Sequence, residues 1–168
     1  MSGGDSSAIE DSMPEAEEVA PAEAPAVEET PAAEPEAEEA VPAAEDPQQV
    51  VKDKLQYSIN LNRPEGYQET HSIKMGAMKD GVSENLNVEL DVGMTYKIIA
   101  KADSDCNDLD MILYDENGNE VGKDFLDDDT PIIDVNPGAT AKYRVKVIMR
   151  SCGNEPCYYG VLILGHEI

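Results

Sequence analysis

The sequence predicts an all-β domain, a jelly-roll-like antiparallel β-sandwich of about eight or nine strands, preceded by an acidic tail. Three observations predict this fold. Apolar and polar residues alternate in short segments with the period of two that half-buried strands show. The segments are bounded by Gly, Pro, Asn or Asp, which favour turns. Hardly any apolar stripe with helical spacing interrupts them. Sandwiches and barrels have this pattern, and at this strand count a jelly roll is the natural form.

Residues 1–47 are the predicted tail. They hold fifteen of the 36 Asp and Glu residues and none of the 12 Lys and Arg residues. Ala, Glu and Pro dominate, the prolines block a long helix, and like charges push the chain open. We expect a disordered, extended spacer, which is either a solubilising tail or a tether. The folded domain then spans residues 48–168.

The first alternating segment is residues 55–61, which predicts a strand. A helix over residues 51–61 is the weaker alternative, because its stripe would place Ser58 and Asn62 in the core. Further strands are predicted at residues 71–78, 84–91, 94–101, 109–115, 120–125, 130–136, 141–150 and 158–165.

The clearest strand lies near residue 145. Four residues point inward there, namely Tyr143, Val145, Val147 and Met149. Four basic residues point outward, namely Lys142, Arg144, Lys146 and Arg150. The chain has no Trp and a single Phe, so the core must be aliphatic with several tyrosines.

The charge of the chain limits its partners. The formal net charge is −24, and residues 48–168 alone hold 21 acidic and 12 basic residues. Such a surface repels phosphate backbones and anionic membranes, which argues against nucleic acid as a partner. No segment approaches the roughly 20 apolar residues that span a bilayer. We expect a monomer whose partner is a protein or polysaccharide surface.

Three segments carry a resemblance to a known family. They are "MGAMKDGVSENLNVELDVGMTYKIIA", "DLDMILYDENGNEV" and "TPIIDVNPGATAKYRVKV". Over residues 70–165 the chain resembles the bacterial pre-peptidase C-terminal (PPC) domain family. The resemblance implies a non-catalytic jelly-roll module of exported bacterial proteins, which often lies beside a peptidase. Some members bind calcium or help attach an enzyme to its substrate. This chain contains no peptidase, so it would be a stand-alone copy.

Acidic residues gather near one predicted strand end. They are Asp103, Asp105, Asp108 and Asp110, with Asp127, Asp128 and Asp129 on the next loop but one. Hard oxygen ligands on loops suit calcium, and loops at one end of a sandwich can converge. The alternative is that these are solvated acids at strand ends. Alternation places Asp110 on the outer face or at the strand edge. No cofactor is required, and Ca²⁺ is the one that the pattern suggests.

The following segment, "DENGNE", is not a calcium-binding EF-hand loop, because its Gly falls too early and the closing Glu is missing. Asn117 and Gly118 are better interpreted as the turn of a two-residue hairpin between Tyr114 and Val121.

Cys152 and Cys157 bracket "GNEP", which is a hairpin loop between two strong strands. This places them within reach of a disulfide. Free thiols are the main alternative, and a zinc site would need Cys106 and His166 to join. The family resemblance implies a second cysteine where this chain has Ala102. Cys106 is therefore unpaired, either buried or a free thiol.

A disulfide implies an oxidising compartment. We therefore expect a periplasmic, lipid-anchored or secreted protein, although the sequence shows no signal peptide. No catalytic motif is visible, and His71 and His166 have no nucleophile pattern near them. The sequence therefore predicts no enzyme, but an exported binding or accessory module on an acidic spacer. The alternative is a structural surface or periplasmic lipoprotein with a spacer tail and no ligand.

Overall fold

The structure is a computed structural model that describes residues 45–168, so the predicted spacer lies almost wholly outside the described residues. The described chain begins with helix α1 (Pro47–Asn62) and a 3-10 turn, η1 (Arg63–Glu65). Nine strands follow in it: β1 (Gln68–Glu69), β2 (Lys74–Met78), β3 (Ser83–Leu90), β4 (Met94–Ala102), β5 (Cys106–Tyr114), β6 (Glu120–Asp124), β7 (Ile132–Val135), β8 (Ala141–Cys152) and β9 (Cys157–Glu167).

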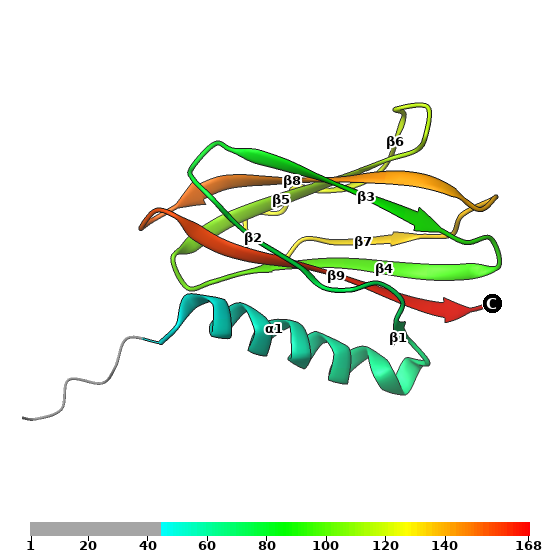
Figure 1. Cartoon of the computed structure of the whole chain (residues 1–168), viewed down its shortest axis with the longest axis horizontal. Helices are drawn as coiled ribbons and strands as arrows, with labels where there is room; N and C mark the ends of the chain where they lie inside the picture. The colour runs from blue at the N-terminus through cyan, green and yellow to red at the C-terminus, as the bar shows by residue number, and fades with distance from the viewer. Residues whose placement is uncertain (1–44) are drawn as a thin grey trace, which may run out of the picture. The chain divides into compact units, whose positions relative to one another are not determined.

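The strands form two antiparallel sheets that pack face to face (Figure 1). Sheet A has the order β2-β9-β4-β7, and β1 also pairs with β9. Sheet B has the order β3-β8-β5-β6. From β2 onward the chain changes sheet at every connection except that between β5 and β6. This connectivity is that of a jelly roll, so the predicted fold class is confirmed.

The core between the sheets is aliphatic with two tyrosines, Tyr96 and Tyr159. The residues predicted to point inward from β8 do line it, whereas the single Phe, Phe125, is 47% exposed. The alternation of β8 is therefore confirmed in the structure.

The prediction of a strand at residues 55–61 is wrong, because this segment belongs to α1. The helix begins where the Asp46 carboxylate accepts a hydrogen bond from the Gln48 amide (3.0 Å) and where Pro47 fits the first turn. Val51 and Leu55 then lie fully buried on one helical face.

The helix buries the two polar residues that argue against it in the sequence. Ser58 and Asn62 are indeed buried, at 5% and 8% exposure. Each donates a side-chain hydrogen bond to a carbonyl one turn earlier: Ser58 to Lys54 (3.2 Å) and Asn62 to Ser58 (2.8 Å). Because these bonds replace the lost hydration, the polar groups are tolerated against sheet A.

Helix α1 lies along the outer face of sheet A (Figure 1). Leu55 joins Ile99, Leu162 and Leu164 in a second apolar cluster. The close approach requires Gly160, since a Cβ there would lie 2.7 Å from Leu55 Cδ1. Sheet A is thus covered on both faces, which explains the continuous apolar run of β9.

The turn at Asn117 and Gly118 is a longer hairpin loop than predicted. Tyr114 pairs with Glu120, which leaves five residues in the loop rather than two. Gly118 takes a φ of 83°, and the Asp115 carboxylate accepts a hydrogen bond from the Asn117 amide (2.9 Å). The aspartate side chain thus organises a wider turn than the dipeptide alone predicts.

Candidate functional site

The predicted acidic residues lie at one end of the sandwich, where the connections from β4 to β5 and from β8 to β9 meet. Asp103 is 1% exposed. Its carboxylate accepts hydrogen bonds from the backbone amides of Asp105 (3.1 Å) and Tyr158 (2.7 Å). Asp103 therefore ties two crossing connections together, and both of its oxygens are already occupied.

Asp110 lies on the outer face of sheet B, as alternation predicts, but it is only 3% exposed. It forms an ion pair with Arg150, which lies on the neighbouring strand β8. The Arg150 guanidinium also lies 5.7 Å from the centre of the Phe125 ring. Asp110 is thus covered and neutralised by a side chain that is distant in sequence.

Asp129 pairs with Lys54 of α1, and the Nζ–Oδ2 distance is 2.6 Å. Burial alone would raise the pKa of Asp129, but hydrogen bonds from Lys54 and Thr130 outweigh burial and lower it. Thr130 also accepts a hydrogen bond from Lys101 (3.0 Å), whose pKa is lowered by burial. This network fastens α1 and the loop before β7 to sheet A.

Asp108 differs from Asp103, Asp110 and Asp129 because one of its carboxylate oxygens has no partner. Its Oδ1 atom is buried and has no hydrogen-bond partner. Burial raises the pKa of Asp108, and the negative charges of Asp110 and Asp127 raise it further. A carboxylate in this setting gains stability from a proton or a cation.

The seven predicted calcium ligands therefore do not form one cluster. Asp105 is exposed beside Asp103, while Asp127 and Asp128 are exposed on the loop next to Asp108. A hydrogen bond from the Leu109 amide to the Asp128 carbonyl (2.8 Å) holds that loop against β5. Among residues 45–168, no three acidic, His or Cys side chains are already placed to hold a metal ion.

The cysteines are arranged as predicted. Cys152 and Cys157 form a disulfide with a Cα–Cα distance of 5.9 Å, which joins the end of β8 to the start of β9. Cys106 is free and buried, with its sulfur 3.3 Å from that of Met149. Burial raises the pKa of the Cys106 thiol to about 11. His166 pairs with Thr95 near the other end of β9, so it does not join the cysteines.

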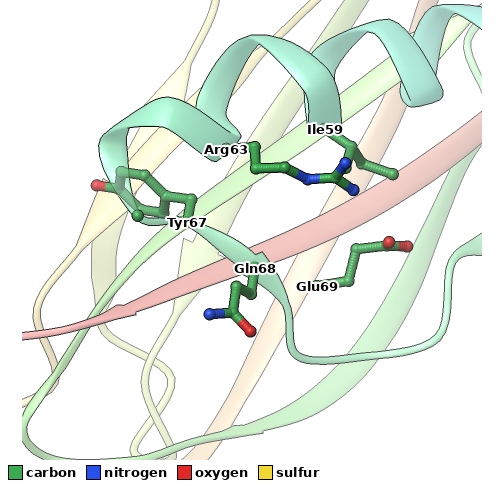
Figure 2. Close-up of a pocket in the computed structure, with 6 residues that line it drawn as sticks. Ile59, Arg63, Tyr67, Gln68 and Glu69 are labelled. Carbon is green, nitrogen blue, oxygen red and sulfur yellow. The ribbon is translucent and has the colours of Figure 1, made fainter.

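A concave pocket of about 430 Å³ lies between the end of α1 and β1 (Figure 2). Its lining consists of Ile59, Arg63, Gly66, Tyr67, Gln68 and Glu69. Arg63 extends from the helix end and Glu69 from β1, and no ion pair between them is present in the described residues (Figure 2). The pocket was not predicted, because residues 55–61 were expected to form a strand rather than part of α1.

Comparison of the sequence with protein-family models and with curated proteins finds no match. In the described part of the chain, no helix has the length and apolar character to span a bilayer.

Proposed function

We propose that this chain is a non-catalytic binding or accessory module that works outside the cytoplasm, as a stand-alone relative of the PPC domains. The resemblance over residues 70–165 and the jelly-roll connectivity support the relationship. The disulfide between Cys152 and Cys157 supports an oxidising compartment, because such bonds persist there and are rare in reducing cytosol.

We further propose that calcium stabilises the module, and one observation carries this proposal. The Oδ1 atom of Asp108 is buried without a partner while neighbouring carboxylates raise its pKa. A carboxylate oxygen that is buried without a partner destabilises a fold, and a bound cation removes that penalty.

We propose that three of the seven predicted residues form the ligand set. The Asp103 carboxylate accepts hydrogen bonds from backbone amides. Asp110 forms an ion pair with Arg150, and Asp129 forms one with Lys54. This leaves Asp108, with Asp127 and Asp128 on the adjoining loop, as the carboxylates that would hold the ion. Calcium suits such a set, because it takes six to eight oxygens in a flexible arrangement that includes carbonyls and water.

Thermal unfolding with and without divalent ions tests the calcium proposal. Millimolar calcium should raise the melting temperature above that in chelator, since binding to the native state adds about 2.7 kcal/mol at a hundredfold excess over Kd. Magnesium should do less, because it demands octahedral geometry and keeps its waters. The Asp108→Asn variant should lose the calcium response.

Asp105→Asn is the matched control, because Asp105 is an exposed acid outside the narrowed set. This variant should keep the full calcium response. Equal shifts from calcium and magnesium in the wild type would mean general charge screening, and the proposed site would then be discarded.

A further inference from the structure

We propose that the Cys106 thiol is an internal exchange partner of the disulfide: it displaces Cys157 from Cys152 and so moves the bond to another pair of strands. This inference goes beyond the proposed function, because it concerns the covalent bonds within the domain and requires neither calcium nor a partner protein. The strand register, a bulge beside Cys106 and the burial of the cysteines carry it.

Cys106 and Cys152 lie directly opposite each other on neighbouring strands, as register partners in the antiparallel pair of β5 and β8. The adjoining pair is hydrogen-bonded, because the Gly153 amide donates to the Asp105 carbonyl (2.7 Å). Since hydrogen-bonded and non-hydrogen-bonded pairs alternate, the two cysteines form a non-hydrogen-bonded pair. Accordingly, the Cys152 amide donates to the Asp80 carboxylate (3.0 Å). Opposed Cα atoms in such pairs lie about 4.5 Å apart, which is within the range that a disulfide spans.

A β-bulge aims the Cys106 side chain at the same side as that of Cys152. From Leu109 onward, alternate residues of β5 face the core, and continued alternation would turn Asn107 inward rather than Cys106. The register instead shifts between Cys106 and Asp108, so Cys106 points inward and is only 6% exposed. Bulges re-aim side chains in this way. Because directly opposed residues share a face of the sheet, the Cys106 thiol lies on the side of sheet B from which Cys152 reaches Cys157.

Burial favours an attack from inside the protein. Cys106 and Cys157 belong to the main core between the sheets, and Cys152 packs against it. The Cys106 sulfur lies 3.3 Å from that of Met149, which is also in this core. A thiol in solution has poor access to a disulfide in this position, whereas the register holds Cys106 next to Cys152. Since the rate of exchange depends on access, Cys106 is the favoured attacking group.

The exchange needs no outside oxidant or reductant. The Cys106 thiolate attacks the Cys152 sulfur, and a bond forms between them. The bond between Cys152 and Cys157 breaks, and its electron pair leaves with the Cys157 sulfur, which takes up the proton that Cys106 released. One thiol and one disulfide are present before and after the step. The covalent link changes from one between the sheets to one within sheet B, which releases the start of β9.

The Cys157→Ser variant of the full chain tests whether the register partners can bond. It is folded in reductant and then exposed to oxidised glutathione. We expect a bond between Cys106 and Cys152, so the variant should take no alkyl label in denaturant and its intact mass should show no bound glutathione. Two labels, or glutathione on either thiol, would overturn the proposal.

Cys152→Ser is the matched control, because the cysteines that it keeps, Cys106 and Cys157, lie on strands of different sheets. In the same treatment, this variant should keep both thiols or carry glutathione on them, rather than form an internal bond. An internal bond in both variants would mean that pairing does not depend on the strand register, and the argument from the register would then fail.

Thiol mapping in the unreduced wild type tests the exchange itself. The protein is incubated in a mildly alkaline native buffer and then denatured in mildly acidic buffer with excess maleimide, because acid slows exchange. Label should be found on Cys157 as well as on Cys106, and the chains labelled on Cys157 should contain a bond between Cys106 and Cys152. The total should stay at one label per chain.

Cys106→Ser is the control for this experiment, since it removes the attacking thiol and should take no label at any time. Two results would overturn the proposal. Label on Cys106 alone in the wild type would show that the disulfide does not move. Label on Cys157 in Cys106→Ser would show that the disulfide opens without Cys106.

Discussion

Asp103 illustrates how one side chain can hold two distant connections in a β-sandwich. Its carboxylate accepts one hydrogen bond from the Asp105 amide, in the connection after β4, and one from the Tyr158 amide, near the start of β9. Outside the strand ladders, neither amide has another backbone partner in the described part of the chain. Loss of the carboxylate therefore leaves two donors unsatisfied in a partly buried site, which is more costly than loss of an exposed hydrogen bond.

We expect Asp103→Ala to lower the free energy of unfolding by about 3 kcal/mol, because two hydrogen bonds to a charged group are lost. Urea unfolding measures the change. Asp105→Ala removes an exposed acid two residues away and should change stability by less than about 0.5 kcal/mol. Similar losses in the two variants would show that Asp103 does not have the structural role described above.

Asp108 should make stability depend on pH in a direction opposite to that of most carboxylates. Its pKa in the folded protein is raised above the ordinary 3.8 by burial and by neighbouring acids. The native state therefore holds a proton that the unfolded state has released, and stability falls as pH rises through the folded pKa. In chelator, Asp108→Asn should raise the free energy of unfolding at pH 7.

This advantage of Asp108→Asn should shrink as the pH falls below 3.8, where the wild-type carboxyl is protonated in both states. Urea unfolding at several pH values measures it. If Asp108→Asn is less stable than the wild type at pH 7, then Asp108 has a stabilising partner and the calcium proposal loses its basis.

The sequence predicts that the aspartates gather at a strand end, but it does not predict which of them form ion pairs and which stay exposed. Asp110 is neutralised by Arg150, forty residues later, and Asp129 by Lys54, seventy-five residues earlier. Only the sheet register and the position of α1 bring these partners together. The sequence of the acidic segment itself contains no signal that separates a covered aspartate from a solvated one.

At the scale of elements, the prediction of a strand in α1 is wrong, whereas β8 and β9 are predicted correctly. The segment at residues 55–61 satisfies the strand period by coincidence, while the signals for a helix start, Asp46 and Pro47, lie before it. β8 has one face in the core, so its alternation was clear. The strand at residues 158–165 was predicted correctly within β9, but the helix that covers the outer face of this strand was not.

A matched pair of leucines tests the helical assignment. A strand would place Leu55 and Leu61 on the same side, whereas the helix leaves them 0% and 62% exposed. Leu55→Ala should lower the free energy of unfolding by about 2–5 kcal/mol, because it opens a cavity against sheet A. Leu61→Ala should change it by less than about 0.5 kcal/mol in the same urea titration. Equal losses would contradict the packing of α1.

At the scale of the whole molecule, the disulfide fastens the two sheets where β8 leaves sheet B and β9 enters sheet A. The closed loop is short, so the chain-entropy gain is only about 2 kcal/mol. Changing Cys152 and Cys157 together to Ser should lower the free energy of unfolding by about that amount. The fold should persist, because Cys157 is only one of the many buried residues of the main core.

Thiol counting by intact mass checks the pairing itself. Unreduced native protein should resist alkylation at neutral pH, because Cys106 is buried and its pKa is raised to about 11. Unreduced protein in denaturant should take one label, and reduced protein in denaturant should take three. Two or more labels without reductant would contradict the disulfide.

The position of β9 in sheet A also sets an order for events during synthesis. β1, β2 and β4 all pair with β9, and none of these three pairs with another of them. Sheet B, in contrast, contains only strands that precede Cys157. A nascent chain that has not yet emerged beyond Cys157 can therefore complete sheet B but not sheet A, and the apolar residues of β4 and α1 stay uncovered. Such a chain keeps these apolar residues uncovered until its last strand arrives.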